Sequence, residues 1–244
     1  MSSLLEVVIA AHGGMDRWRE VRTVTTGVRS WGLTWARKGQ QFLFSGVTAE
    51  AATTRQAVQV DPFTGEGRRG LYTPDRVRIE SADGTILEDR QRPREAFTGH
   101  TLESPWDHLH GLYFGGYALW NYFNLPFLAA RLDVDAQEID PWDEAPGKKW
   151  RRLRLAFPPH IATHSSVQDL YVDDNGLIVR HDYAPEVIAS APSSNYLYDY
   201  SEYDGIMFPS LRKVVRRSTD NRTGPQSDDD KLLIGIEFSE YTLA

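Results

Sequence analysis

The segment His164–Tyr183 carries the densest group of side chains able to do acid–base or hydrogen-bonding chemistry. It is divided by Asp-Asp-Asn-Gly at 173–176, and Asn-Gly supplies the positive φ angles that a tight hairpin turn needs. The two-residue loop is either 175–176 or 174–175, and these alternatives differ by an even shift in register. Each face of the predicted hairpin therefore holds the same residues in both registers.

One face of this hairpin combines apolar and polar side chains. Its apolar members predict that it points to the core: Leu170, Val172, Leu177 and Val179. Four polar residues share that face: His164, Gln168, His181 and Tyr183. Burying such groups costs about 1–3 kcal/mol each unless they are paired. They form either a satisfied structural network or, as we favour, a polar patch lining a cavity. The opposite face is charged and is predicted to meet solvent, with Arg180 near Asp169 or Asp173.

On the cavity interpretation the hairpin supplies catalytic groups. His164 or His181 would be the base, because imidazole titrates near neutral pH. Tyr183 and Tyr113 would donate hydrogen bonds to developing oxygen charge, and Gln168 would fix a histidine tautomer. The predicted catalytic residues are His164, His181 and Tyr183.

The segment Pro105–Leu128 is apolar and aromatic, has few β-branched residues, and predicts a long helix. A stripe at helical spacing carries Trp106, His110, Tyr113, Tyr117 and Trp120. This stripe is either an aromatic core face or a cavity wall, and Gly115-Gly116 would allow close approach of another group. The predicted ligand-binding residues are His110, Tyr113, Tyr117, Trp120 and Gln168. Asp107 and His108 fall on other sides of the helix and are predicted to be surface or capping groups.

Several site classes find no support in the sequence. Cysteine is absent, which excludes thiolate metal sites and a cysteine nucleophile. A zinc site at His110, His164 and His181 would need the fold to bring three distant histidines together, so we predict no metal. Neither a G-x-G-x-x-G nor a phosphate-binding loop occurs, and no cofactor is expected. The net charge of -7 argues against a nucleic-acid partner, and no apolar run is long enough to predict membrane insertion.

The remaining segments are predicted to be strands, because apolar and polar residues alternate along them and turn-forming residues separate them. The predicted strands are Thr23–Ala36, Gln41–Val47, Thr53–Val60, Arg76–Ser81, Thr85–Arg90, Lys149–Phe157, Ser165–Asp173, Leu177–Tyr183, Asn195–Tyr203, Ile206–Arg217 and Leu232–Tyr241. Asp133–Gly147 is predicted to be an acidic connection and Ser218–Lys231 a solvated loop. The prediction is one α+β domain over residues 1–244. About eleven antiparallel strands form one continuous meander, curved into a half-barrel around the central helix.

Two short sequence segments resemble those of the LolA/LppX-like half-barrel family of lipoprotein carriers. They are Ala11-His12-Gly13-Gly14 with Trp18 and Val21, and the strand entry Tyr203-Asp204-Gly205-Ile206-Met207-Phe208-Pro209. The resemblance implies an open antiparallel half-barrel wrapped around helices and enclosing an apolar cavity. A narrower likeness is to bacterial proteins without an assigned activity, which share Phe157-Pro158, Ala162-Thr163-His164-Ser165 and Arg180-His181-Asp182-Tyr183. The carriers have export signals and this sequence shows none, so we expect a cytoplasmic bacterial branch of this family.

Two functions follow from this reading, and both place a hydrophobic or aromatic small molecule in the half-barrel cavity. The first is a cofactor-independent acid–base enzyme of isomerase, cyclase, lyase or hydrolase type, which the missing export signal favours. The second is a non-catalytic carrier of lipid-like or other hydrophobic ligands, which the family resemblance favours. The substrate, the reaction and the oligomeric state do not follow from the sequence.

Overall fold

The computed structural model describes residues 3–221 and 232–244, which form one curved antiparallel sheet of 13 strands. The first six strands are β1 (Thr23–Trp31), β2 (Ser45–Ala52), β3 (Val58–Asp61), β4 (Arg68–Thr73), β5 (Arg76–Ser81) and β6 (Ile86–Gln91). The other seven are β7 (Asp135–Ala145), β8 (Lys148–Ala156), β9 (Val167–Val172), β10 (Ile178–Tyr183), β11 (Ser193–Tyr203), β12 (Ile206–Arg216) and β13 (Ile234–Leu243). This sheet confirms the predicted α+β half-barrel, with slightly more strands than expected.

Two meanders meet in the middle of the sheet. The strand order is β6-β5-β4-β3-β2-β1-β13-β12-β11-β10-β9-β8-β7, so β1 pairs with both β2 and β13. The prediction of one continuous meander is therefore wrong at this single junction. The chain leaves one half at the edge strand β6 and enters the other half at the opposite edge strand, β7. The long helix α4 (His108–Asn124) lies in the connection between the halves.

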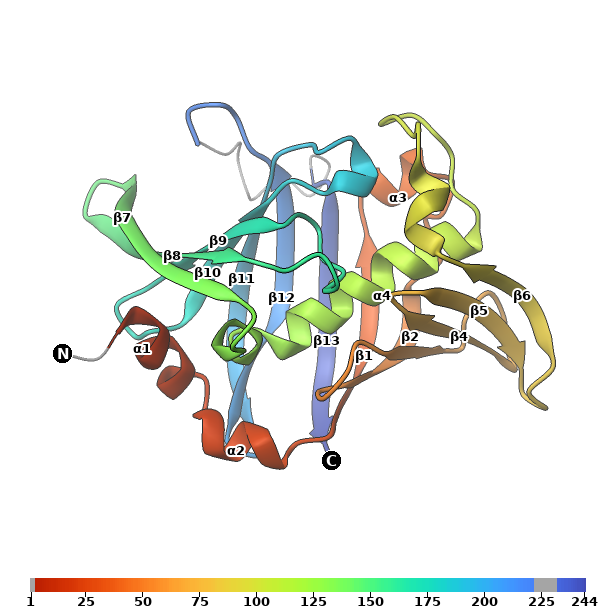
Figure 1. Ribbon diagram of the computed structural model, residues 1–244, viewed down its shortest axis with the longest axis horizontal. Helices are drawn as coiled ribbons and strands as arrows, with labels where there is room; N and C mark the ends of the chain where they lie inside the picture. The colour runs from red at the N-terminus through yellow and green to blue at the C-terminus, as the bar shows by residue number, and fades with distance from the viewer. Residues whose placement is uncertain (1–2, 222–231) are drawn as a thin grey trace.

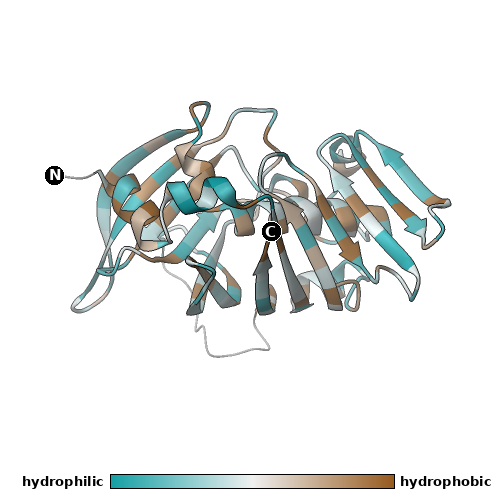
Figure 2. Ribbon diagram, turned by 90° about the horizontal axis from the view of Figure 1, so that it is seen from below, coloured by the Kyte–Doolittle hydropathy of each residue, from teal (hydrophilic) through white to brown (hydrophobic). Residues whose placement is uncertain are grey.

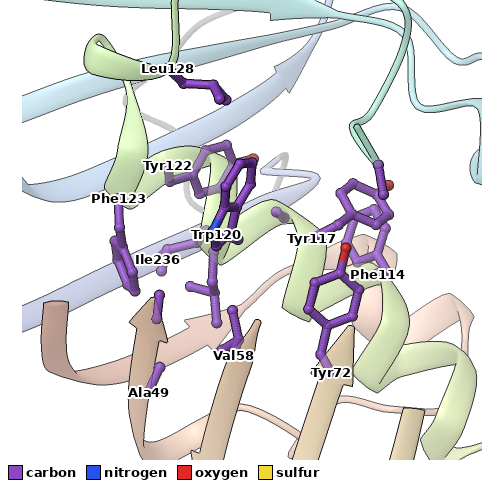
Figure 3. Packing of buried hydrophobic residues seen from close by; sticks show 14 of the residues in the cluster. Ala49, Val58, Tyr72, Phe114, Tyr117, Trp120, Tyr122, Phe123, Leu128 and Ile236 are labelled. Carbon is purple, nitrogen blue, oxygen red and sulfur yellow. The ribbon is translucent and has the colours of Figure 1, made fainter. Parts of the chain in front are cut away.

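Helix α4 crosses the concave side of the sheet, as Figure 1 shows in light green. It begins after Asp107, whose carboxylate accepts a hydrogen bond from the backbone N–H of His110, so the capping role of Asp107 is confirmed. From Leu109 to Asn124 every residue except His110 is buried. The helix is shorter at both ends than predicted, and Trp106 lies outside it. Figure 3 shows Val58 of β3 beneath the ring of Trp120 and Tyr72 of β4 pointing towards Tyr117.

Shorter helices cover the ends of the sheet. They are α1 (Leu4–Ala11), α2 (Met15–Glu20), α3 (Leu33–Arg37) and the 3-10 turns η1 (Pro93–Phe97), η2 (Phe127–Ala130) and η3 (Glu186–Ile188). Figure 2 shows teal and brown bands alternating along the strands, as a sheet with one core face requires. No helix of the described residues is long and apolar enough to cross a membrane.

Two strands were not predicted. β7 lies where an acidic connection was expected, and its Pro141 falls within a register shift between Ile139 and Trp142. An edge strand tolerates proline at such an irregularity, because one side of the strand has no ladder to complete. β4 contains Gly70, where a Cβ atom would lie 2.8 Å from Leu112 of α4, so close packing against the helix requires glycine there.

Strand boundaries also differ in the first half of the sheet. The strand predicted from Thr23 to Ala36 ends at Trp31, because Gly32 has a φ of 122° and starts α3. Most of the predicted loop 218–231 lies outside the described residues.

The outer face of the β9–β10 hairpin is buried at Tyr171, Arg180 and Asp182, which corrects the prediction that this face meets solvent; only its start, at Val167, is exposed. Arg180 is fully buried and forms ion pairs with Asp182 at 2.7 Å and Glu144 at 2.9 Å, not with Asp169 or Asp173. A bulge between Ile178 and Arg180 turns Ile178 to the main core and Val179 to an outer apolar cluster. Trp150, Tyr171, Tyr196, Val215 and Leu232 form this outer cluster.

Candidate functional site

His164 lies at the centre of a buried hydrogen-bond network between α4 and the β9–β10 hairpin. Its Nδ1 atom is 3.1 Å from the hydroxyl of Tyr117, and its Nε2 atom is 2.9 Å from the hydroxyl of Tyr122. The hydroxyl of Tyr122 is also 2.8 Å from that of Tyr183. The rings of His164 and Tyr183 stack with centroids 4.0 Å apart. We call these four residues the His164 network.

The His164 network is uncharged at neutral pH. Burial lowers the pKa of His164 to about 3, and the charge of Arg94 acts in the same direction. Burial also raises the pKa of Tyr117, Tyr122 and Tyr183 above the ordinary value for tyrosine. A neutral imidazole has one donor and one acceptor nitrogen, so one tyrosine must donate to His164 while the other accepts from it. The donor and acceptor roles of the three hydroxyls and the imidazole therefore depend on one another, and none of these groups changes its protonation state near pH 7.

His181 forms a second polar pair on the same face of the sheet. Its Nε2 atom is 2.5 Å from Oε1 of Gln168, so Nε2–H donates and Nδ1 is left as the acceptor. His181 lies opposite Leu170, which is one of the two registers derived from the turn. Burial lowers the pKa of His181 well below its ordinary value, and the positive charge of Arg212 adds to the effect. By accepting this hydrogen bond, Oε1 of Gln168 favours the tautomer of His181 that carries its proton on Nε2.

The helix residues of the predicted site are dispersed rather than gathered. Tyr117 joins the His164 network, but Tyr113 accepts a hydrogen bond from Arg94. His110 lies in the first turn of α4, 2.7 Å from Asp107 and 3.2 Å from the carbonyl oxygen of Ala96.

Trp120 donates to the carbonyl oxygens of Ala52 and Arg55 at the strand side of the helix. His110, His164 and His181 each have different partners. Across residues 3–221 and 232–244, no group of three or more His, Asp or Glu is arranged to hold a metal ion.

Tyr122 and Arg212 are two polar residues of this region that the sequence analysis missed. Tyr122 lies off the stripe at three- and four-residue spacing, and α4 is buried on all sides, so a stripe cannot select its functional face. The guanidinium of Arg212 stacks 4.3 Å from the centroid of the Tyr122 ring. The available signal for Arg212 was its position in β12, where it shares the alternation of the buried residues Ile206, Phe208 and Val214.

Two small apolar cavities lie between α4 and the middle of the sheet. The larger, about 50 Å³, reaches His164 and Tyr183, and the smaller, about 30 Å³, reaches Tyr122. Phe114 and Ile234 line both cavities, so the two adjoin. Figure 3 shows Phe114, Tyr122 and Ile236 in this layer. We call this space the seam, and its walls are otherwise formed by side chains such as Val28, Trp35, Ala118, Val214 and Ile236.

Gly115 and Gly116 do allow the close approach predicted from the sequence, but protein rings occupy the space. A Cβ atom at Gly115 would lie 2.2 Å from the ring of Phe44, and one at Gly116 would lie 2.3 Å from the ring of Tyr72. Through these contacts α4 packs closely against the first half of the sheet, at Phe44 before β2 and at Tyr72 of β4.

A larger and more polar cleft of about 730 Å³ opens to solvent on the other side of Tyr113. Its wall residues include Arg94 and Glu186, which form an ion pair, and Asp75 of the β4–β5 turn. Arg94 also donates to the carbonyl oxygen of Thr163, the residue before His164. The open cleft and the buried network are therefore neighbours, because Thr163 lines the cleft and His164 follows it in the chain.

Comparisons with known proteins identify the fold. No protein-family model and no curated protein matches the sequence. A DUF1329 family protein from Desulfovibrio piger is 12% identical, with a TM-score of 0.55 over 98% of this chain and 91% of its own. A LolA superfamily protein from Nitrosomonas europaea is 9% identical, with a TM-score of 0.53 over 100% of this chain and 94% of its own. The chain thus has a LolA-like half-barrel fold.

Proposed function

We propose that this protein binds a hydrophobic small molecule in the seam between α4 and the central strands. The observation that carries the proposal is the pair of adjoining apolar cavities ending at the hydroxyls and imidazole of the His164 network. Side chains that line an empty cavity lack dispersion contacts on that side, and a ligand that fills the cavity supplies these contacts. A few convergent polar groups at one end of an apolar pocket are the usual means of orienting such a ligand.

The seam must widen to admit a ligand of useful size. A dry apolar cavity of about 150 Å³ binds benzene, and the two cavities of about 50 and 30 Å³ are smaller. The lining of the larger one includes Lys38, Leu102, Pro185, Ile188, Ala191 and Ser193, and we expect entry between them. Lys38 is held there by its Nζ atom, which donates to the carbonyl oxygens of Thr101, Leu102 and Ser104. Entry on this side would break the hydrogen bonds of Lys38 and move Leu102 and Ile188, which pack against the core.

Binding is better supported than acid–base catalysis. A general base works best with a pKa near the operating pH, whereas burial lowers the pKa of both His164 and His181 far from that range. Both ring nitrogens of His164 are also occupied by tyrosine hydroxyls. The His164 network therefore resembles a polar end wall of a binding pocket more than a catalytic site. Of the two proposed functions, we favour a non-catalytic binder or carrier.

Filling the seam tests this proposal. Ala118 of α4 lines the smaller cavity, and Ala118→Val adds two methyl groups there at a cost of about 1 kcal/mol or less in helix propensity. The probe is the neutral fluorophore N-phenyl-1-naphthylamine, titrated into the purified protein. We expect saturable fluorescence enhancement with the native chain and at least tenfold weaker binding with Ala118→Val.

Val167→Leu is the control, because Val167 is an exposed strand residue away from the seam. Its titration should match that of the native chain. Absence of saturable binding, or equal affinity in Ala118→Val and the native chain, would contradict the proposal.

A further inference from the structure

Arg212 of β12 is a buried charge without a counter-ion. Only 3% of its surface is exposed, and no carboxylate of the described residues lies within ion-pair distance. Its protein contacts are the Tyr122 ring and the Tyr122 carbonyl oxygen, 3.4 Å from Nη2, while Nε has no partner. Arg180, the other deeply buried arginine of this half, has two carboxylate partners. Arginine keeps its charge in proteins, so an unpaired buried guanidinium is unfavourable unless something else neutralises it.

Two further unpaired nitrogens belong to residues of the same small space. Arg212, His12 and His181 together line a cavity of about 10 Å³. His12 uses Nδ1 on the carbonyl oxygen of Val8 at 2.8 Å, and His181 uses Nε2 on Gln168. In both histidines the other ring nitrogen is buried without a partner. The remaining walls are mainly apolar: Leu125, Leu170, Ile178, Leu197, Met207 and Pro209, with Tyr200.

The chemistry of these groups selects what can bind there. A cation is disfavoured by the guanidinium charge. A water molecule can accept from Arg212 and donate to the imidazoles, but it leaves the charge uncompensated. A carboxylate accepts hydrogen bonds from Arg212 and supplies the missing negative charge. The free nitrogens of the two neutral imidazoles are acceptors, so a water molecule that donates to them would link them to the carboxylate.

The position of the cavity links it to the seam. Tyr122 lines the seam, and Arg212 stacks on the ring of Tyr122. A side-chain movement of Tyr122 would therefore join the apolar space to the charged one. We propose that the ligand of the seam is a hydrophobic acid whose carboxylate pairs with Arg212, an inference that rests on the proposed function.

The test compares two probes with the same tail, laurate and 1-dodecanol, by competition with N-phenyl-1-naphthylamine at pH 7.5. In the native chain laurate should bind at least tenfold more tightly than 1-dodecanol, because only laurate neutralises Arg212. In Arg212→Met that preference should disappear, with the affinity for 1-dodecanol changed less than about threefold. Arg154→Met, which removes an exposed arginine of β8, is the control and should keep the preference.

The outcomes separate the two proposals. Equal affinity of the native chain for both probes, or a laurate preference that survives in Arg212→Met, overturns the carboxylate site and leaves the proposed function standing. Failure of the native chain to bind either probe removes the proposed function itself. If Arg212→Met does not fold, Arg212→Gln takes its place, and the comparison of probes on the native chain decides independently of any variant.

Discussion

The two buried arginines of the second half of the sheet differ in their surroundings. Arg180 is enclosed by Asp182 and Glu144, whereas Arg212 has aromatic and backbone contacts only. Removing one partner of a buried ion pair typically costs about 3–5 kcal/mol, because the other charge is left uncompensated. We expect Arg180→Met to lose about that much unfolding free energy and Arg212→Met to lose little or to gain. Urea unfolding of both variants measures this, and a large loss in Arg212→Met would show that its charge is compensated within the protein.

The hydroxyl of Tyr122 is the junction of the His164 network. It lies 2.9 Å from His164 and 2.8 Å from Tyr183, and the site is buried. Tyr122→Phe should lower the unfolding free energy by about 1–3 kcal/mol, since it leaves buried partners unsatisfied. Tyr203→Phe is the matched control, because Tyr203 packs by its ring against Tyr241 and is only partly buried. Equal, small effects of both substitutions would show that the network contributes no specific stability.

Buried neutral histidines make the protein sensitive to mild acid. Burial lowers the pKa of His12 to about 4 and of His164 to about 3, and lowers that of His181 as well. In the unfolded chain each histidine titrates near pH 6.5. As the pH falls below 6.5 the unfolded state binds protons that the folded state does not, so stability falls with the pH. The neighbouring charges are Arg212 and Asp173 for His12, Arg94 for His164, and Arg212 for His181.

The expected loss is up to about 1.4 kcal/mol per histidine for each pH unit between about 6 and 4. It stops as the pH falls below the folded-state pKa values. Urea unfolding at pH 7.5, 6 and 5 measures the slope, and His181→Gln should reduce it by one histidine's share. His108→Gln, at an exposed histidine, is the matched control for the loss of one imidazole. A stability that is flat between pH 7.5 and 5 would contradict the assignment of neutral, buried histidines.

At the scale of elements, α4 is positioned by glycines rather than by an amphipathic stripe. Gly111, Gly115 and Gly116 each face a bulky side chain at a distance that a methyl group would not permit. Alanine normally favours a helix over glycine by about 1 kcal/mol. Gly116→Ala should nevertheless destabilise the protein by about 1–3 kcal/mol, because the added carbon overlaps the ring of Tyr72. A thermal melt at or above the native midpoint would show that α4 can shift and would weaken this account of its placement.

The turn chemistry of one hairpin was enough to predict part of the site. Asn175-Gly176 sets the parity of β9 and β10, so the turn alone places Gln168, His181 and Tyr183 on one face, whereas His164 lies before β9 and is brought to them by the preceding loop. The parity argument failed locally at Ile178 and Val179, because a bulge has no clear sequence signal here. It also misplaced Arg180, since the sequence does not show that β7 supplies Glu144 as its partner.

At the scale of the whole molecule, the half-barrel consists of two meanders joined at β1 and β13, with α4 between them. This arrangement gives one continuous sheet with an apolar concave face, and it puts residues from both halves around a single helix. The sequence predicted the fold class from alternating polarity, but the pairing of β1 with β13 depends on contacts more than 200 residues apart. Such long-range pairing leaves no local pattern in the sequence. The same holds for the cavity at Arg212, whose lining residues His12 and His181 are far from it in the chain.

The most direct measurement of the central claim is a crystal structure of the native chain with 12-bromododecanoic acid, in which anomalous scattering locates the bromine. The account predicts bromine density in the seam, near Phe114 and Ile234, with the carboxylate next to Arg212. Bromine in the open cleft beside Arg94, or no ordered ligand in a protein that binds the acid in solution, would contradict it.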